Sequence, residues 1–258
     1  MKVLALTQAR TASTRLPRKV LMEIGGKSLL RIHCERAMAA SKIDKMIVCT
    51  STSEEDKAIC EEAGRIGLDC YRGSEDNVLD RFYQAAKPHQ PRYVVRITSD
   101  CPLIDPALLD TVIQYTMDNA PDYCSNFFEA AFPDGQDIEV FTFEALEKAA
   151  QHATRTIELE HVTPYIRENS DYKGGNMFHG INYAPDRDYG HVRITVDEQT
   201  DFDMMTRLIG DLGLDKTWKE YTDYLEAHPE ISGINSNIMR NEGYYKQLAK
   251  ENKPATDE

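Results

Sequence analysis

Short apolar runs alternate with helix-length segments along the first half of this 258-residue chain. The runs cover residues 2–7, 45–50, 68–71 and 93–98, and each is too short to form a helix. Ser28 is positioned to cap the first intervening helix, which we expect to reach about Ala40. Strands that alternate with helices of this length predict parallel βαβ units with right-handed crossovers. The pattern therefore indicates an α/β fold built on a mostly parallel sheet flanked by helices.

The rhythm changes beyond about residue 120, where the predicted elements become more mixed. We expect strands at 122–128, 137–141, 176–184 and 191–196, and helices at 143–151, 156–168, 200–212, 218–226 and 241–251. No internal repeat, low-complexity block or Gly/Ser/Pro linker separates the two halves. A single domain is predicted over residues 1–251, with halves at about 1–120 and 121–251, and the polar segment 252–258 is expected to be disordered.

The composition narrows the class of protein. A formal net charge of −13 argues against nucleic acid or an anionic membrane as the main partner. No apolar run approaches the roughly 20 residues that cross a bilayer. No signal-peptide pattern is present either, so a cytoplasmic protein is expected. The six cysteines include no CxxC pair, which predicts free thiols, Cys70 among them, in place of a zinc site or disulfides.

A basic loop follows the first predicted strand, in contrast to the acidic balance of the whole chain. It holds Arg10, Arg15, Arg18 and Lys19. Two interpretations compete: surface ion pairs, which are common and weak, and binding of a polyphosphate, whose charge would offset the repulsion among the cations. Ligands of open α/β sheets bind at the carboxyl ends of strands, and this loop lies at such an end. Its position favours phosphate binding.

Two acidic residues directly follow predicted strands, Asp100 after the strand 93–98 and Asp197 after the strand 191–196. The alternative role for Asp100 is a helix cap, but Asp105, directly before Pro106, is better placed for that. Mg²⁺ binds in proteins through few carboxylates together with phosphate oxygens. Asp100 is therefore expected beside the basic loop, as a ligand of Mg²⁺.

Four further polar residues have both a functional and a structural interpretation. Asp137 and Glu139 alternate along a predicted strand, so they share one face, which either contacts a metal or acceptor or is simply exposed. His161 lies in a predicted helix, where a lone histidine is more often structural than functional. Arg193 shares a strand face with Asp197, and it either binds an acceptor carboxylate or forms an ion pair.

Several ordered motifs resemble those of the cytidylyltransferases that activate sugar acids, a family that includes the CMP-Kdo and CMP-sialic acid synthetases and SpsF-like proteins. The most specific is Gln8-Ala9-Arg10, followed at 13–21 by Ser-Thr-Arg-Leu-Pro-Arg-Lys-Val-Leu. The family has glycine where Arg18 stands, so the backbone of this loop has less freedom. The Gly-x-Asp-x-Glu element at 135–139, the Glu-His-Val-Thr-Pro sequence at 160–164 and residues 240–246 also match SpsF-like proteins.

The resemblance spans residues 4 to about 246 and implies a Rossmann-like, nucleotidyltransferase-type fold with a nucleotide-binding first half and an acceptor-binding second half. It implies Mg²⁺-dependent transfer of CMP from CTP to an acidic acceptor with release of pyrophosphate, in polysaccharide or glycoconjugate synthesis. The acceptor would be a sugar acid or another carboxylated or phosphorylated metabolite. Asp100 and Asp197 match the metal ligands of the family. The resemblance also suggests a homodimer.

The expected site residues follow from the loop, the strand ends and the resemblance. Catalytic roles are expected for Arg10, Lys19 and Asp100, and metal binding for Asp100 and Asp197. The expected nucleotide contacts are Leu6, Thr7, Gln8, Ala9, Arg10, Arg15, Lys19, Arg72, Ser74 and Asp100, with an ordinary strand-to-helix turn as the alternative for 72–74. The expected acceptor contacts are Asp137, Glu139, His161 and Arg193. Catalysis would then depend on positioning and electrostatics, with no protein nucleophile.

Two other functions compete with this one. A metal-dependent glycosyltransferase would use Asp201-Phe202-Asp203 as an Asp-x-Asp motif, although these residues lie late in the chain, at the start of a helix. A catalytically silent nucleotide-binding protein would be favoured by the absence of Asp100 or Asp197, and both acids are present.

Overall fold

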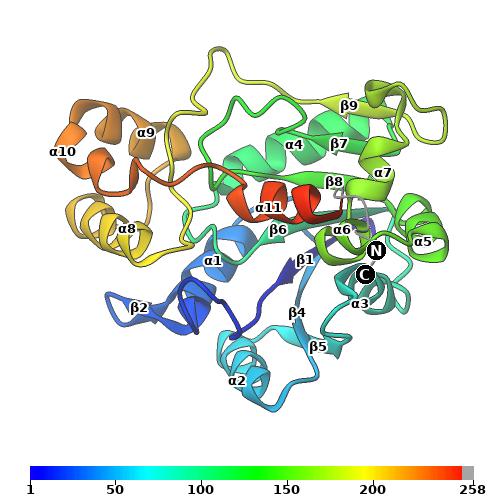
Figure 1. Ribbon diagram of the computed structural model, residues 1–258, viewed down its shortest axis with the longest axis horizontal. Coiled ribbons are helices and arrows are strands. Elements are labelled where there is room, and N and C mark those ends of the chain that lie inside the picture. Colours follow the sequence, from blue (N-terminus) through cyan, green and yellow to red (C-terminus); the bar gives the residue numbers. More distant parts are fainter. Residues whose placement is uncertain (252–258) are drawn as a thin grey trace, which may run out of the picture.

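The central sheet has seven strands in the order β5-β4-β1-β6-β8-β7-β9 in the computed structural model, which describes residues 1–251 (Figure 1). β1 pairs in parallel with β4 and β6, whereas β8 runs antiparallel to both of its neighbours. This mixed, mostly parallel sheet confirms the predicted fold class. The strands are β1 Val3–Gln8, β4 Lys45–Ser51, β5 Asp69–Gly73, β6 Tyr93–Thr98, β7 Tyr123–Ser125, β8 Glu139–Thr142 and β9 Gly180–Asn182.

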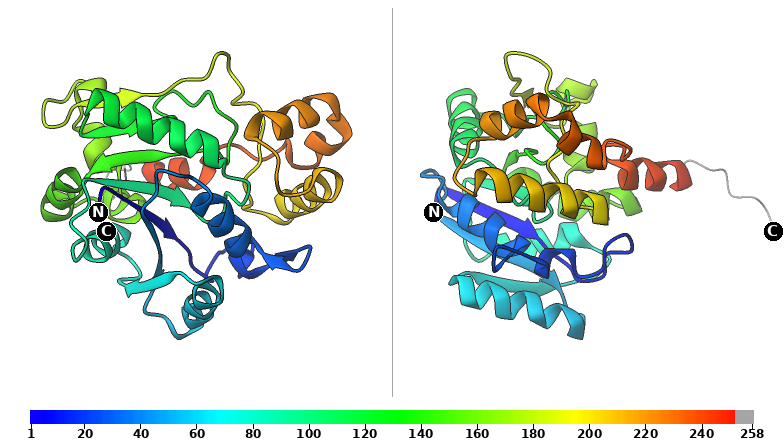
Figure 2. Two further views of the ribbon diagram at one scale, coloured as in Figure 1. Left: turned by 180° about the vertical axis from the view of Figure 1, so that it is seen from behind. Right: turned by 90° about the vertical axis from the view of Figure 1, so that its left-hand side faces the viewer.

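Helices cover both faces of the sheet (Figure 2). α1 Leu29–Met38, α2 Lys57–Ile66 and α4 Pro106–Asn119 share one apolar core with the sheet. On the other face lie α3 Val78–Ala86, α5 Phe143–His152, α6 Thr156–His161 and α7 Pro164–Glu168, where a second core forms. Because β7, β8 and β9 come from the second half of the chain and join strands of the first half, one sheet runs through both halves.

A smaller group of helices packs beside the sheet, at the left of Figure 1. It comprises α8 Gln199–Leu212, α9 Trp218–Ala227 and α10 Pro229–Ser232. A third apolar cluster joins it to α1 through Leu29 and Ile32. The last helix, α11 Glu242–Glu251, crosses in front of the sheet and reaches α6 (Figure 1).

Local sequence signals fix the starts of two helices that frame the site. The Ser28 hydroxyl accepts a hydrogen bond from the Arg31 amide at 3.0 Å and caps α1. Asp105 accepts from the amides of Ala107 and Leu108, at 2.7 and 3.0 Å, directly before Pro106 begins α4. Both caps were predicted from the sequence alone.

Three predictions about the second half are wrong. Residues 191–196 form no strand, because the segment meets its neighbours only at isolated points, such as the bridge between Asp134 and Arg193. The helix expected over 156–168 is divided into α6 and α7, because Val162 adopts a φ of 72° and Pro164 begins a new helix. The strand expected over 176–184 shrinks to the three residues of β9.

The prediction for the cysteines is partly wrong. Cys60 of α2 and Cys70 of β5 form a disulfide, because the helix returns the chain beside the strand and leaves their α carbons 5.3 Å apart. Cys34, Cys49, Cys101 and Cys124 are buried free thiols, as expected. No helix in the described part of the chain is both long and apolar enough to span a membrane. The tail predicted at 252–258 lies outside the described residues.

Candidate active site

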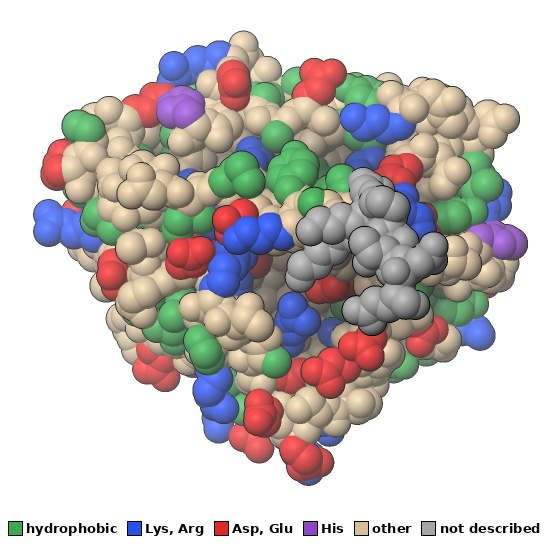
Figure 3. Space-filling model, in the orientation of Figure 1, with side chains coloured by type: hydrophobic (Ala, Val, Ile, Leu, Met, Phe, Trp, Pro, Cys, Tyr) green, Lys and Arg blue, Asp and Glu red, His purple; other side chains and the backbone are tan. Residues whose placement is uncertain are grey.

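A cleft of about 1000 Å³ opens at the carboxyl ends of β1 and β6, where the strand order reverses. Its walls are the basic loop after β1, the turn after β6, residues from 134–139, and the helices α6, α7 and α11. Figure 3 shows this face hollowed at its centre, with Lys and Arg side chains beside the hollow and Asp and Glu side chains along its edge. The basic loop therefore lies where a ligand of an open α/β sheet is expected.

The basic loop is held in place by a buried acid on the neighbouring turn. The Asp56 carboxylate accepts hydrogen bonds from the Thr11 amide and hydroxyl, at 2.8 and 2.7 Å. It also accepts from the Ser51 hydroxyl at 2.5 Å, which joins the loop to the end of β4. The Thr11 carbonyl in turn accepts from the Arg18 amide at 2.9 Å. These bonds fix the backbone that presents Arg10 and Arg15 to the cleft.

Arg18 explains why the family pattern has glycine at this position. Its φ is 59° and its ψ is 21°, in the left-handed region where residues other than glycine are strained. Its side chain is exposed and does not line the cleft, so the extra cation faces solvent.

Lys19 occupies the centre of the phosphate side of the cleft, between two carboxylates. Its ammonium donates hydrogen bonds to Asp100 at 3.2 Å, to Asp197 at 2.8 Å and to the Val196 carbonyl at 2.8 Å. Burial alone would lower the pKa of Lys19, but the two acids outweigh it and raise that pKa. Likewise, burial would raise the pKa of Asp100, but Lys19 holds it well below its usual range. Lys19 and Asp100 are therefore both charged at neutral pH.

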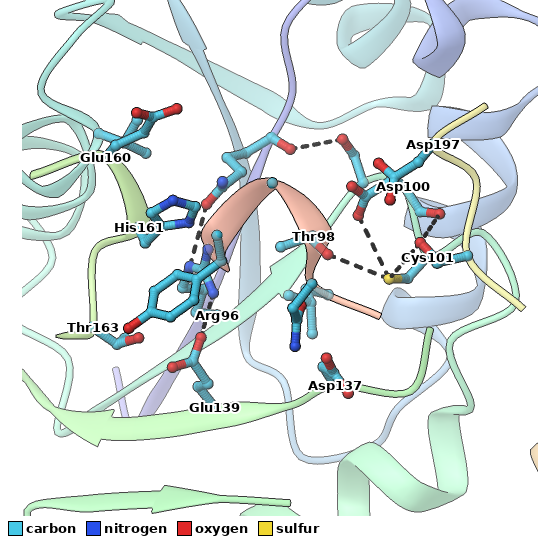
Figure 4. Close-up of a pocket in the computed structure, with 18 of the residues that line it drawn as sticks. Arg96, Thr98, Asp100, Cys101, Asp137, Glu139, Glu160, His161, Thr163 and Asp197 are labelled. Atoms are coloured by element: carbon cyan, nitrogen blue, oxygen red, sulfur yellow. Dashed lines mark hydrogen bonds and ion pairs between the residues drawn. The ribbon is translucent and has the colours of Figure 1, made fainter. Parts of the chain in front are cut away.

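Backbone hydrogen bonds bring the two acids together from distant parts of the chain. The Asp100 carbonyl accepts from the Val196 amide at 2.8 Å and from the Thr195 hydroxyl at 3.0 Å. In Figure 4, Asp100 and Asp197 lie side by side at one end of the pocket, while Arg96, Glu139 and His161 gather at the other. Arg15 adds a second cation contact to Asp197, at 2.9 Å.

Arg193 holds Asp197 in place through an ion pair and also pairs with two other carboxylates. Its guanidinium bonds to Asp134 at 2.5 Å, to Asp197 at 3.1 Å and to Asp201 at 2.8 Å, and only 9% of its side chain is exposed. It does not line the cleft, so the ion-pair interpretation accounts for its position better than the expected contact with an acceptor. Gly135 permits this arrangement, because a Cβ there would lie 2.5 Å from the Ile194 carbonyl oxygen.

The expected acceptor residues Asp137, Glu139 and His161 do line the cleft. Asp137 pairs with Arg240, but burial still raises the pKa of Asp137 to about 7. Glu139 is buried and pairs with Arg96 from the adjacent strand β6.

His161 belongs to the same end of the pocket. Its Nε2 lies 2.9 Å from the Gln247 side-chain oxygen on α11. Burial lowers the pKa of His161, so its imidazole is neutral at pH 7. The neutral ring is able to donate a hydrogen bond to Gln247.

Four expected nucleotide contacts are not brought to the cleft surface. Leu6 and Thr7 are fully buried in the middle of the sheet, where β1 pairs with a strand on each side. The Arg72 guanidinium donates to the carbonyls of Ser51 and Ser53, at 3.1 and 2.7 Å, and so has a structural role. The Ser74 hydroxyl accepts from the Asn77 amide in the turn before α3, which matches the alternative of an ordinary turn. The remaining expected contacts, Gln8, Ala9, Arg10, Arg15, Lys19 and Asp100, line the cleft.

Sequence reasoning missed the part of the site formed by α7 and α11. Arg167 of α7, and Tyr244 and Gln247 of α11, line the cleft. Glu160 also lines it, 3.8 Å from Arg10. The helical pattern at 241–251 predicted a helix but contained nothing to place it over the cleft. The signal that could have directed attention to Arg167 is its position three residues after the Glu-His-Val-Thr-Pro sequence.

The acids of the glycosyltransferase alternative do not form a metal site. Asp201 is fully buried and accepts hydrogen bonds from Arg193, Asn235 and the amides of Asp197 and Glu198. Asp203 is exposed and bonds to Gln199. These contacts are those of a helix start.

Within residues 1–251 no group of three or more His, Cys, Asp or Glu side chains is arranged to hold a metal on its own. The pair Asp100 and Asp197 still fits Mg²⁺, which takes few protein carboxylates and fills its other positions with water and phosphate oxygens. Their partly exposed carboxylates, 29% and 21%, face the cleft beside the basic loop.

The doubly wound sheet, the basic loop at its switch point and the facing carboxylates are the features of a nucleotidyltransferase. Comparison with known proteins gives the family. The family model described as cytidylyltransferase matches residues 4–231, and the chain belongs to that family. The solved structure of a cytidylyltransferase from Leptospira borgpetersenii has a TM-score of 0.85 and 31% identity, and the match covers 93% of this chain and 98% of that one.

Two curated relatives match most of this chain, and a third matches about half of it. An uncharacterized protein of Methanocaldococcus jannaschii is 39% identical over 93% of this chain and 97% of its own. The spore coat polysaccharide biosynthesis protein SpsF of Bacillus subtilis is 31% identical over 89% of this chain and 96% of its own. A 3-deoxy-manno-octulosonate cytidylyltransferase of Trichlorobacter lovleyi is 31% identical over 46% of each chain.

Proposed function

We propose that this protein transfers CMP from CTP to an acidic sugar or a related anionic metabolite. In this reaction an acceptor oxygen forms a bond to the α-phosphorus of CTP, and the bond from that phosphorus to the bridging oxygen breaks. Pyrophosphate leaves, and the hydroxyl proton of the acceptor passes to water. The proposal rests on one observation: Lys19 bonds to both Asp100 and Asp197 in the cleft, beside Arg15.

Each charged group of the phosphate side has a role in this proposal. Arg10, Arg15 and Lys19 bind the triphosphate and neutralise charge on the departing pyrophosphate. The hydrogen bonds that Thr11 donates to Asp56 keep the loop rigid, so that little entropy is lost when CTP binds. Gln8 and Ala9, at the end of β1, border the same cleft and complete the nucleotide side.

Asp100 and Asp197 are proposed to hold Mg²⁺. When bound, the metal would neutralise charge on the phosphates and make the α-phosphorus a better electrophile. Arg193 keeps the Asp197 carboxylate aimed at the cleft, and the Asp100 carbonyl fixes the spacing of the two chain segments.

The relatives support an acid as the acceptor. One of them is named for 3-deoxy-manno-octulosonate, a sugar acid, and another for the synthesis of spore coat polysaccharide. We therefore propose a sugar acid destined for a polysaccharide or another glycoconjugate as the acceptor class. His161 is proposed to orient the acceptor, and Asp137 to contact one of its hydroxyl groups.

Pyrophosphate release tests this proposal. The protein with Mg²⁺ is given CTP, UTP, ATP or GTP, each with a panel of sugar acids and anionic phosphometabolites. We expect release with CTP and one acceptor, and its loss in Asp100→Asn. The matched control is Asp203→Asn, which changes an exposed acid outside the cleft and is expected to retain activity. Pyrophosphate release in the absence of any acceptor, or equal release by Asp100→Asn and the parent, would contradict the proposal.

A further inference from the structure

Arg167 differs from four other arginines of the cleft in the partners it has. Arg81 is buried, and its guanidinium donates hydrogen bonds to the carbonyls of Ser74 and Glu75. Arg10 pairs with Glu160, Arg15 with Asp197 and Arg96 with Glu139. No carboxylate in the described part of the chain forms an ion pair with Arg167, although the residue is half-buried and lines the cleft. Burial alone would lower the pKa of Arg167, but nearby groups that include Glu139 and Glu168 raise it, so the guanidinium is charged although neither carboxylate pairs with it directly.

A neutral residue of α11 holds this guanidinium. Arg167 Nη2 donates to the Tyr244 hydroxyl at 2.8 Å, and the guanidinium carbon lies 5.3 Å from the centre of the Tyr244 ring. A guanidinium has five N–H donors in a planar fork that matches a carboxylate or phosphate. One phenol oxygen satisfies a small part of this capacity, so an entering anion would bind Arg167 more strongly than Tyr244 does.

The neighbours of Arg167 form a corner suited to an oxyanion. Thr163 and His161 line the cleft within six residues of Arg167, and both point into the pocket in Figure 4. The neutral His161 ring interacts with Gln247 of α11. Arg96 lies at the same end of the pocket and contributes positive charge, although Glu139 already pairs with it.

α11 closes this corner on the side away from the sheet. Its Glu242 lies 3.9 Å from Arg15 of the basic loop. At its other end, Glu251 accepts from the Ile157 amide at 2.7 Å and lies 3.5 Å from Arg155 at the start of α6. The helix therefore runs along the cleft from Arg15 to the start of α6. Figure 1 shows it crossing in front of the sheet.

We propose that Arg167 is the anchor for the anionic group of the acceptor, with Tyr244 as the group it releases when the acceptor binds. The inference rests on the proposed function and names a specificity-determining residue for it. A carboxylate and a phosphate share the chemistry that Arg167 recognises. The anion would lie between α7 and α11, at the end of the pocket that holds His161 and Glu139.

Calorimetric titration tests this anchor separately from the reaction. The probes are 3-deoxy-manno-octulosonate, N-acetylneuraminate, the methyl ester of each, and ribose 5-phosphate. Each probe is titrated without nucleotide and with a methylene analogue of CTP plus Mg²⁺, which fills the phosphate loop. We expect at least one anionic probe to bind, and its neutral ester to bind at least tenfold more weakly. In Arg167→Gln the affinity for the anion should fall at least tenfold. Tighter binding of a sugar acid or of the phosphate identifies which anion the corner selects.

Three further variants separate recognition from folding. Arg167→Lys keeps the charge without the fork and should retain part of the affinity. Tyr244→Phe removes the competing hydroxyl and should bind the anion at least as tightly as the parent. Arg65→Gln changes an exposed arginine of α2 and should bind like the parent.

The inference is overturned if every probe fails to bind, if acid and ester bind equally, or if Arg167→Gln binds the anion as well as the parent does. CTP affinity is measured in the same samples. If the protein does not bind CTP but binds an anion in a manner that depends on Arg167, the proposed function is wrong and the role of Arg167 as an anion anchor stands. If CTP-dependent turnover is unchanged when Arg167 is substituted, only the role of Arg167 as an anion anchor is wrong.

Discussion

Lys19, in the loop after the first strand, donates a hydrogen bond to Asp197, 178 residues further along the chain, over 2.8 Å. The same ammonium also bonds to Asp100. One cation thus balances two carboxylates that would otherwise repel each other at the edge of the cleft. The contact explains how an acidic chain keeps a charged, preorganised site before any ligand is present.

Removing this cation should reduce catalysis more than it reduces stability. In Lys19→Met the triphosphate loses a bound charge and the two acids lose their common partner. We expect kcat/KM for CTP to fall roughly 100- to 1000-fold, the usual cost of losing one preorganised charge. Steady-state kinetics of pyrophosphate release measure this. The neighbouring cation provides the control, since Arg18→Gly should stay within threefold of the parent.

Arg18→Gly should also make the protein more stable. The left-handed backbone at this position costs about 1–2 kcal/mol for a residue with a Cβ, and glycine removes this strain. Glycine also loses more conformational entropy on folding, which offsets about 0.5–1 kcal/mol of the gain. We expect the free energy of unfolding to rise by about 0.5–1 kcal/mol in urea titrations. Arg18→Ala retains the Cβ and should show no gain. A loss of stability in the glycine variant would mean that the Arg18 side chain makes contacts that outweigh the strain.

Arg193→Leu should destabilise the fold. The substitution leaves Asp134, Asp197 and Asp201 without their shared cation, in a region where Asp201 is fully buried. Breaking a buried ion pair by removing one partner costs about 3–5 kcal/mol. Chemical denaturation should show a loss of that size, whereas Arg187→Leu, at an exposed pair with Glu226, should change stability by less than about 1 kcal/mol. Equal effects of the two substitutions would refute the role given to Arg193.

His33 should make the stability depend on pH. It is fully buried between Thr7 and the Cys101 carbonyl, at 3.0 and 2.9 Å, and burial lowers the pKa of His33 from 6.5 to about 4. Between these values the unfolded chain binds more protons than the native one, so stability is complete above pH 6.5 and falls as the pH drops towards 4. The shift corresponds to roughly 3 kcal/mol.

Urea titrations of metal-free protein at pH 7 and pH 4 measure this effect. The drop in the free energy of unfolding should be smaller in His33→Gln than in the parent, by roughly the same 3 kcal/mol. His152→Gln replaces an exposed histidine of α5 and should behave like the parent. A parent and His33→Gln that lose the same stability would show that His33 does not control the acid response.

Much of the fold was predictable because its signals are local. The short runs of β1 and β6, the Ser28 cap and the Asp105-Pro106 helix start depend on neighbouring residues only. The basic loop and Asp100 could be assigned to one edge, because the carboxyl ends of adjacent parallel strands must meet there.

The missed features depend on contacts between distant residues. Val192, Ile194 and Val196 alternate like a strand and are buried, but they pack against α8 and α9 without a partner strand. The position of α11 over the cleft depends on Glu251 reaching the start of α6, which no local pattern encodes. The break at Val162 was the readable exception, because Pro164 disfavours a continuous helix through the residues before it.

Transfer of CMP is tested most directly by phosphorus NMR of the reaction mixture. CTP, Mg²⁺ and the acceptor chosen by the pyrophosphate assay are incubated with the protein. We expect the three CTP resonances to give way to one phosphodiester resonance, coupled to the acceptor, and to pyrophosphate in equal amount. Asp100→Asn should leave CTP intact. CDP with inorganic phosphate, free CMP alone, or a CTP spectrum unchanged by the active protein would contradict transfer of CMP.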